Sequence, residues 1–308
     1  MAEITAAMVK ELRETTGAGM LDCKKALVEA DGNMEQAVDW LRKKGLASAA
    51  KKSSRIAAEG LAAVAVEGNR GAAVEVNSET DFVAKNDIFQ AYVDDAAKVA
   101  LACDGDVEAM KAYNDTTVGK TFGERLTDMI AKIGENMNLR RARVISVNEG
   151  LVCSYVHNAV HNGLGKIGVL VALESSADKE KLADLGKHIA MHIAATAPIA
   201  LNIDGVDARA VEHEKAIFAE QAAASGKPAN IIEKMVEGRI RKFYEEVVLE
   251  EQAYIMDPDK KIKTVIADAA KEFGVDVKLT DYVFYKLGDG LQKKEEDFAA
   301  EVAAQLGN

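Results

Sequence analysis

Aromatic residues and prolines are both scarce in this sequence of 308 residues. Phenylalanine, tyrosine and tryptophan make up 5% of the chain although 48% of it is hydrophobic, so alanine and aliphatic residues supply most of the apolar surface. Such a composition favours closely packed helices. The three prolines, at positions 198, 228 and 258, stand between predicted elements and mark breaks in the chain.

Cysteine is also rare, and the arrangement of the three cysteines excludes a disulfide-rich domain and a small cysteine-based metal domain. Cys23, Cys103 and Cys153 are odd in number and widely separated, so they form neither a disulfide framework nor a CxxC metal site. Unpaired cysteines are typical of proteins kept in a reducing compartment. We therefore expect a cytoplasmic protein.

The sequence also lacks an apolar run long enough to span a membrane, and its start, MAEITAAMVKEL, is amphipathic and acidic rather than a secretory signal. Acidic residues outnumber basic residues by 50 to 39, which gives a net charge of −11. This charge argues against a broad surface for the phosphate backbone of nucleic acids. The sequence predicts a soluble protein without direct membrane or nucleic-acid contact, long enough for one large domain or roughly two to three small ones.

Residues 1–54 are predicted to form a small unit of three helices. Thr5 can cap the first helix, and glycine-containing breaks follow at 16–19 and 31–33. Apolar residues at helical spacing close a small core, including Leu27, Val38 and Leu41. The pattern resembles a ubiquitin-associated (UBA) domain, a class of module that binds partner surfaces. Residues 51–55, KKSSR, are interpreted as a solvated linker.

The middle of the chain repeats one arrangement. Residues 61–77 and 151–174 each predict two strands joined by a glycine-containing turn, and a helix follows each pair. A further helix is predicted over 122–139, between the two repeats. This repetition predicts two related α+β subdomains with antiparallel sheets.

The last third of the chain is mostly helical. Residues 207–250 predict two helices of similar length around a turn at 225–228, an antiparallel helical hairpin. A helix over 264–273 and a pair of strands over 275–286 follow. A final helix over 293–306 carries three apolar residues on one face, Phe298, Val302 and Leu306.

The junction between strand and helix at 78–83, with the sequence SETDFV, is unusual because it contains a large aromatic residue. Thr80 or Asp81 is a suitable N-cap for the helix that follows. Phe82 is either tucked into the core or offered to a partner, and the residues alone favour the core because most aromatic side chains are structural.

Two glycine motifs suggest a nucleotide site, and both fail. Residues 163–168 spell GxGxxG, but a dinucleotide fingerprint needs a helix directly after it, and a β-branched strand follows here. A hairpin turn explains these glycines. Gly119-Lys120-Thr121 ends like a P-loop, yet Asn114 occupies the position of the required first glycine.

The histidines do not predict a metal or catalytic site. His188 and His192 lie one helical turn apart, but neither a glutamate at the expected position nor a third ligand accompanies them. His157 and His161 flank a predicted turn without a serine or cysteine nucleophile in a recognisable context. The sequence therefore predicts no catalytic residue, no metal and no cofactor.

Six segments resemble the bacterial elongation factor Ts family. LRETTGAGMLDCKKAL at 12–27 and EVNSETDFVAK at 75–85 match its two signature motifs. The other matches are KIGEN at 132–136, HIAMHIA at 188–194, KMVEGR at 234–239 and FAAEVAAQ at 298–305. The resemblance covers essentially the whole chain, although the turn HNAVHNGLG and residues 104–125 look longer than is usual in the family.

The resemblance implies a guanine nucleotide exchange factor that strips GDP from the GTPase elongation factor Tu. It also implies a different place for Phe82. In the family, the tip of this junction is offered to the GTPase, so Thr80, Asp81, Phe82 and Val83 are expected at the partner surface. Asp81 and Phe82 would intrude beside the magnesium and phosphate site.

Further site residues follow from the same resemblance. Met20, Leu21 and Lys24 would dock on the nucleotide domain of the GTPase, as would Phe298 and Val302. His157, Ile255 and Met256 would meet a second domain of the GTPase.

The implied fold class is α+β in five parts. They are a UBA-like helical domain at 1–54, a core N-subdomain at 55–144, a core C-subdomain at 145–206 and 246–288, a helical hairpin at 207–245 and a C-terminal helical module at 289–308. The hairpin corresponds to the family's dimerisation module, so a homodimer is possible.

Two other classes of function compete with this one. A UBA-type adaptor without exchange activity rests on residues 1–54 alone and leaves the junction at 78–83 unexplained. A nucleotide-binding enzyme rests on the rejected glycine motifs. Release of GDP from a loaded GTPase, together with a test for nucleotide binding by the protein alone, separates the three.

Overall fold

The computed structural model describes residues 4–16, 18–223 and 228–292, and over this part the chain is a mixed α/β protein with antiparallel sheets. It divides into two compact units. The first unit comprises Met1–Ala63, Val74–Ala142 and Lys286–Asn308, and the second comprises Val64–Ala73 and Arg143–Tyr285.

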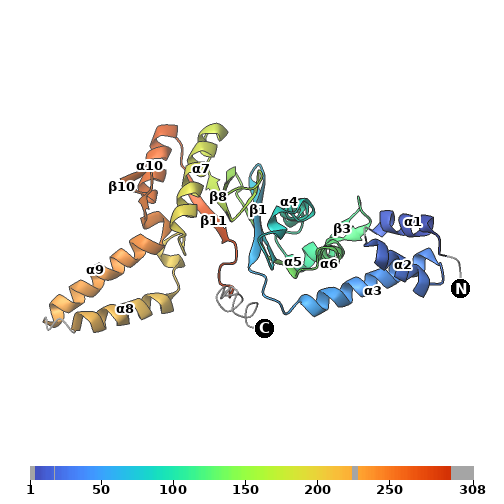
Figure 1. Ribbon diagram of the computed structural model, residues 1–308. Coiled ribbons are helices and arrows are strands. Elements are labelled where there is room, and N and C mark those ends of the chain that lie inside the picture. The colour runs from blue at the N-terminus through green and yellow to red at the C-terminus, as the bar shows by residue number, and fades with distance from the viewer. Residues whose placement is uncertain (1–3, 17, 224–227, 293–308) are drawn as a thin grey trace. The chain divides into compact units, whose positions relative to one another are not determined.

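The first unit begins with three helices, α1 (Ala6–Thr16), α2 (Met20–Glu29) and α3 (Met34–Lys52) (Figure 1). The hydroxyl of Thr5 accepts a hydrogen bond from the Met8 amide, and the Asn33 side chain accepts one from the Gln36 amide, so both residues act as N-caps. The apolar faces of the three helices form one small core, which buries Val9, Leu12, Cys23, Ala26, Leu27, Ala30 and Ala37.

The third helix is longer than its sequence pattern predicts. Because α3 continues to Lys52, the interpretation of residues 51–55 as a linker is wrong for the first two of them. The helix packs on α6 (Phe122–Ile133), where a Cβ added at the buried Gly45 would lie 3.9 Å from Thr127 and from Ala131. Helix packing therefore joins the N-terminal helices to the rest of the first unit.

Three further helices of the first unit follow the junction. They are α4 (Asp87–Ala102), α5 (Val107–Ala112) and α6, with a hairpin of β3 (Asn114–Asp115) and β4 (Lys120–Thr121) before α6. The buried rings of Tyr92 and Phe122 stack at 4.2 Å between α4 and α6. The helix predicted over 122–139 is wrong beyond Ile133, because Gly134 has a φ of 91° and ends the helix in the left-handed conformation that glycine adopts easily.

A strand, β5 (Met137–Ser146), takes the place of the last part of that predicted helix. It belongs to a sheet with the strand order β5-β2-β1-β7. In this sheet β1 (Glu59–Glu67) and β2 (Arg70–Ser78) form the first predicted pair. The predicted turn at 163–168 is only partly a turn, because it contains β7 (Leu164–Gly165) and the start of β8 (Ile167–Glu174).

The second unit contains a sheet with the order β11-β8-β6, built from β6 (Gly150–His157), β8 and β11 (Lys278–Lys286). Strands β6 and β8 are antiparallel, with Gly150 opposite Glu174 and His157 opposite Ile167. The strand pair predicted over 275–286 is wrong, because this segment forms the single strand β11, which pairs with β8.

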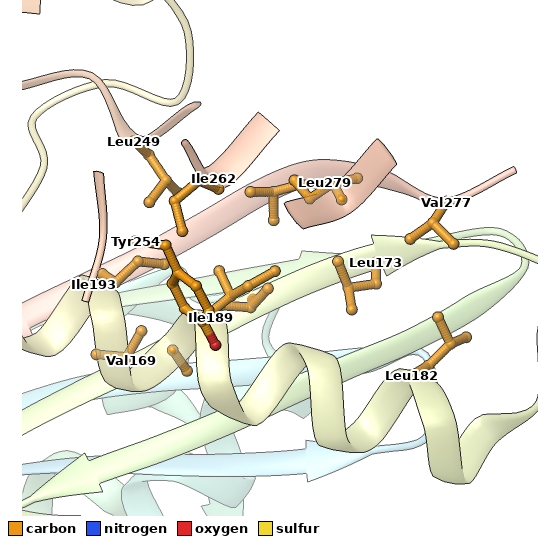
Figure 2. Close-up of a cluster of buried hydrophobic side chains, with 13 residues drawn as sticks. Val169, Leu173, Leu182, Ile189, Ile193, Leu249, Tyr254, Ile262, Val277 and Leu279 are labelled. Carbon is orange, nitrogen blue, oxygen red and sulfur yellow. The ribbon is translucent and has the colours of Figure 1, made fainter. Parts of the chain in front are cut away.

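The core of the second unit lies between this sheet and helix α7 (Lys179–Thr196) (Figure 2). Leu182, Ile189 and Ile193 share one face of α7. The remaining buried residues come from β8, from α10 (Ile262–Phe273), from β11 and the residues just before it, and from Leu249 and Tyr254. Tyr254 belongs to β9 (Ala253–Tyr254), which pairs with β10 (Asp257–Lys261). Full burial of an aliphatic side chain contributes about 1.5–3 kcal/mol, so this cluster is a main source of stability for the second unit.

Helices α8 (Ala208–Ala223) and α9 (Ala229–Val247) pair as the predicted helical hairpin. The guanidinium of Arg239 lies 5.6 Å from the centre of the Phe218 ring across this pair. The base of the hairpin is held by an apolar cluster, in which Ala200, Val206, Val211 and Val248 are buried and Phe243, Tyr244 and Val247 pack against them. The final helix predicted over 293–306 lies outside the described residues. No described helix is both long and apolar enough to cross a membrane.

Among the described residues of the first unit, one carboxylate is buried, that of Glu75 on β2, and four hydrogen-bond donors surround it. The guanidiniums of Arg140 and Arg141 donate to it at 3.0 and 2.6 Å, the Asn77 amide at 3.0 Å and the Gly288 backbone N–H at 2.9 Å. Burial alone would raise the pKa of Glu75, but these hydrogen bonds and the two cations bring the pKa below its ordinary value of 4.5.

The pKa of Glu75 leads to a testable prediction. Because the pKa is lower in the folded state than in the unfolded state, the charged carboxylate stabilises the protein above about pH 4.5, and this stabilisation is lost as the pH falls through the folded-state pKa. Glu75→Gln is expected to lower the free energy of unfolding at pH 7 by about 2–3 kcal/mol, because it leaves two guanidiniums without their carboxylate. Urea titrations at pH 7 and at decreasing acidic pH measure this, and the difference from wild type should shrink in acid. Glu67→Gln, at the exposed end of β1, is the control; a deficit for Glu75→Gln that is equal at every pH would contradict the prediction.

Candidate partner-binding surface

The junction after β2 brings the chain from full burial to full exposure within a few residues. Gly71 to Ser78 are all buried, Thr80 is half-buried, and Asp81 and Phe82 are exposed, with Phe82 at 76%. Val83 is buried again and begins a single 3₁₀ turn, Val83–Lys85. Phe82 therefore stands on a short turn between two buried anchors, and the core position that the residues alone favour is wrong.

Val83 differs from the other three residues predicted for this tip. Its side chain is 3% exposed, so it is not available to a partner in this structure. It holds the tip to the protein instead. The exposed part of the tip is Asp81 and Phe82.

The N-cap predicted at Thr80 or Asp81 is also wrong. Asn86 caps α4, and its side-chain oxygen accepts hydrogen bonds from the backbone N–H groups of Ile88 and Phe89 at 3.0 and 3.4 Å. Asp81 forms an exposed ion pair with Lys85 at 3.4 Å, and an exposed pair contributes little to stability. The sequence did contain the correct signal, because Asn86 directly precedes the apolar periodicity of α4.

The base of the tip is fastened to the segment that follows α6. The Glu135 carboxylate accepts one hydrogen bond from the Thr80 backbone N–H at 2.9 Å and one from the Thr80 hydroxyl at 2.7 Å. In the opposite direction, the Glu79 carboxylate accepts a bond from the Asn136 backbone N–H at 2.5 Å. We call these four residues the clasp. The sequence identified residues 132–136 only as a family motif, and no local pattern pairs them with residues 79 and 80.

The N-terminal helices present a second exposed apolar surface within the first unit. Met20 and Leu21, in the first turn of α2, are 60% and 83% exposed, and Lys24 is exposed one turn later. Met20 borders a shallow groove that also touches the end of α6. The groove is lined by Lys10, Arg13, Glu14, Ala18, Gly19, Met20, Asp22, Ala131 and Lys132.

Three of the other residues predicted to bind the partner lie in the second unit. His157 is exposed at the end of β6, and its Nδ1 lies 3.1 Å from the Tyr155 hydroxyl. Ile255 and Met256 are 42% and 45% exposed in the turn between β9 and β10. Phe298 and Val302 lie outside the described residues.

The two histidines at helical spacing have structural surroundings. His192 is buried, with Nε2 3.0 Å from the Gln252 side-chain oxygen and Nδ1 accepting from the Ile255 N–H at 3.3 Å. Burial lowers the pKa of His192, and the bond with Gln252 opposes this only in part. His188 pairs with Asp184 at 3.4 Å on the same helix. No cluster of three metal-ligating residues occurs over the described ranges.

The glycine motifs are occupied by ordinary structure. Residues 163–168 lead into a strand, so no helix N-terminus faces a pyrophosphate there. Helix α6 does begin directly after Thr121, but the Thr121 hydroxyl and the Glu124 carboxylate form a capping box that satisfies the N–H groups of Glu124 and Thr121, and the Phe122 N–H donates to the Tyr113 carbonyl. Neither motif provides the open cradle of N–H groups that a nucleotide needs.

Comparison with known proteins gives one consistent result. The family model "Elongation factor TS" matches residues 79–289, a range that begins at the tip and contains the clasp. The chain is 58% identical over 307 residues to "Elongation factor Ts" of Rhodospirillum rubrum, covering 99% of each chain. It is 57% identical over 306 residues to the protein of that name from Rhizobium etli, again with 99% of each covered, and 57% identical over 307 residues to that of Paramagnetospirillum magneticum, with 100% and 98% covered. Together with the exposed tip on its anchored turn, these matches over nearly the full length show that the chain belongs to the elongation factor Ts family of guanine nucleotide exchange factors.

Proposed function

We propose that this exchange factor releases GDP from elongation factor Tu by inserting Asp81 and Phe82 beside the magnesium and phosphate site of the GTPase. The observation that carries the proposal is the 76% exposure of Phe82 on a turn that is anchored on both sides. A large apolar side chain held in solvent adds nothing to the fold, and exposed apolar groups of this kind mark contact sites.

The physical logic concerns the way in which a GTPase holds its nucleotide. Magnesium and a cradle of backbone N–H groups bind the phosphates, and both depend on the position of nearby helices and loops. A wedge on the magnesium side displaces these groups only while it is inserted. The factor and GDP therefore weaken the binding of each other in a ternary complex. Coupling of ~5 kcal/mol would loosen GDP several thousandfold.

The proposal assigns the chain no covalent chemistry and no cofactor. Exchange requires only a difference in affinity between two states of the GTPase. A protein of this kind works in the cytoplasm, where translation takes place, without direct contact with nucleic acid or a membrane.

We assign docking to two further surfaces. The first is the exposed start of α2, with Met20, Leu21 and Lys24, which would contact the nucleotide domain of the GTPase. The second comprises His157, Ile255 and Met256 of the second unit, which would contact another domain. The C-terminal module with Phe298 and Val302 would add to the first contact.

We further assign the five-part division predicted from the sequence to this function. The N-terminal helices and the two core subdomains carry the contacts with the GTPase. The hairpin of α8 and α9 serves self-association, as its length and its position away from the tip in the sequence suggest.

The role of Phe82 is tested by its truncation. Because the side chain is exposed, Phe82→Ala is expected to change the free energy of unfolding by less than ~1 kcal/mol. GDP release from the complex should slow by about tenfold or more, since each tenfold corresponds to about 1.4 kcal/mol of lost coupling. Asp81→Ala should act in the same direction without loss of stability, because Asn86 and not Asp81 caps α4. A melting curve and the release of fluorescent GDP are measured on the same sample.

Tyr113→Ala is the matched control for this test, because Tyr113 is another exposed aromatic residue of the first unit, at 40%. It should leave both quantities unchanged. A large fall in melting temperature with a normal release rate for Phe82→Ala would restore a structural role for this side chain. Binding without any acceleration of GDP release by the wild type would favour the adaptor function instead.

The start of α2 is tested by Leu21→Ala. Leu21 is 83% exposed, so its truncation should leave the melting temperature unchanged. Affinity for the GTPase is expected to fall by about tenfold if Leu21 is a buried apolar anchor of the complex. Leu46→Ala, which truncates a leucine 52% exposed on α3, is the control and should bind normally. Equal affinity of both variants in a titration would remove α2 from the docking surface.

The helical hairpin is tested by its removal. Replacement of residues 213–241 by a short Gly-Ser bridge leaves Val211 and Phe243 in the cluster at the hairpin base, so the second unit should stay folded. Self-association, measured by light scattering, should be abolished, while one-to-one binding to the GTPase persists. Loss of both together would place the hairpin on the exchange surface.

A further inference from the structure

We propose that Glu135 is the positioning residue of the exchange tip, an inference that rests on the proposed role of Phe82. Among the described residues, both hydrogen bonds of the Glu135 carboxylate go to Thr80, the residue before Asp81 and Phe82. Glu135 itself does not touch the GTPase in this proposal. It acts by holding the turn from which Phe82 projects.

Thr80 is immobilised by every polar group it has. Its backbone N–H and its hydroxyl donate to the two oxygens of Glu135, and its carbonyl oxygen accepts a hydrogen bond from the Ser78 hydroxyl at 2.9 Å. Hydrogen bonds to a charged acceptor are stronger than those between neutral groups. The residue is therefore fixed on three sides directly before the exposed tip.

The clasp works in both directions between two segments that lie 55 to 57 residues apart. Residue 135 accepts from the backbone of residue 80, and residue 79 accepts from the backbone of residue 136. Arg55 adds to the clasp, because its Nη1 lies 3.3 Å from Glu79 and its carbonyl oxygen accepts from the Asn136 side chain at 2.7 Å. Rotation or sliding of the tip would break several of these bonds together.

The far side of the tip is held differently. Val83 and Ala84 are buried, the Phe82 carbonyl accepts from the Lys85 N–H at 3.1 Å, and Asn86 caps α4. These contacts are apolar or local in sequence. Glu135 thus supplies the only long-range side-chain hydrogen bonds to Thr80–Val83 within the described part of the chain.

A fixed base is what a wedge requires. Insertion must displace groups of the GTPase. If the tip were mobile, the free energy of docking would deform the tip and would not displace those groups. Preorganisation avoids the ordering of the loop at the moment of insertion. Loss of the clasp should therefore slow GDP release in the complex more than it weakens formation of the complex.

The experiment compares Glu135→Gln with Thr80→Val in the full-length protein. Glutamine keeps the shape of Glu135 but removes the charge that strengthens both hydrogen bonds to Thr80, and valine removes the hydroxyl donor. At saturating factor, we expect either variant to release fluorescent GDP about tenfold more slowly than wild type, as the loss of one charge-assisted hydrogen bond allows. The Kd for the nucleotide-free GTPase should be unchanged. The effect of the double variant should be smaller than the product of the two single effects, because both substitutions act on the same pair of residues.

Two further measurements separate positioning from general stabilisation. In the free protein, the Thr80 amide should exchange with solvent faster in Glu135→Gln, whereas amides in the middle of α4 and α6 should not. Thr80→Ser keeps both donors and should restore the GDP release that Thr80→Val slows. The control is Asp106→Asn, which alters a carboxylate that likewise accepts two backbone hydrogen bonds, at 2.8 and 3.0 Å, as the N-cap of α5. It should leave GDP release unchanged.

Each outcome has one meaning. Normal release by Glu135→Gln and Thr80→Val, with slow release by Phe82→Ala, would overturn this inference and leave the proposed function intact. Normal release by all three would overturn the proposed role of the tip itself. Loss of affinity in place of loss of rate would assign Glu135 to the docking surface, and loss of the fold would make it a general structural anchor. Both of these results also contradict the proposal.

Discussion

Glu75 carries a charge in the middle of a strand whose residues from Gly71 to Ser78 are all closed to solvent, and the surrounding segments compensate it. Arg140 and Arg141 approach from β5, and the backbone N–H of Gly288 comes from near the end of the described chain. One buried carboxylate thus ties together three segments that are distant in sequence. Few alignments of β5 beside β2 would bring both guanidiniums onto it, so the charge also specifies the register.

The same strand explains the form of the tip. A chain that leaves a fully buried strand must satisfy its backbone groups quickly or remain mobile. Here the clasp satisfies them on one side and the cap of α4 on the other, while the side chains of Asp81 and Phe82 are exposed. A disordered loop leaves its backbone groups to water, whereas this turn has its backbone groups bonded and still exposes an apolar side chain. That combination is typical of a contact surface. An aromatic side chain in solvent does not stabilise the fold. Such exceptions are expected at functional sites.

Much of the fold could be predicted from periodicity and breaks. The first strand pair, α4, α7, the helical hairpin and the three N-terminal helices all follow from alternation, helical spacing and glycine. Strand β5 was missed because the helix predicted over 122–139 continued past Gly134 into its first residues, and no strand was predicted for the rest of MNLRRARVIS. The carboxylate partner of Arg140 and Arg141 lies 65 and 66 residues away, and no local pattern contains it.

The candidate site, like the fold, could be predicted only in part. A phenylalanine can be buried or exposed, and the local pattern around Phe82 favoured burial, which is wrong. The family resemblance predicted an exposed position for Phe82, and the structure has one. The cap was misplaced because Thr80 and Asp81 are as suitable chemically as Asn86, and the choice depends on where Glu135 holds Thr80. Val83 was assigned to the surface with its neighbours because a four-residue motif does not reveal which side chains of a turn point inward.

The contacts at the two ends of helix α6 have an additional consequence. Along its length it packs against α3, and Arg42 of α3 pairs with Glu124 in its first turn. Its last turn lies beside the groove bordered by Met20, and the residue after its cap is Glu135. A helix of this length is a stiff rod of about 18 Å. A tilt of this helix would therefore move the N-terminal helices and the base of the tip together.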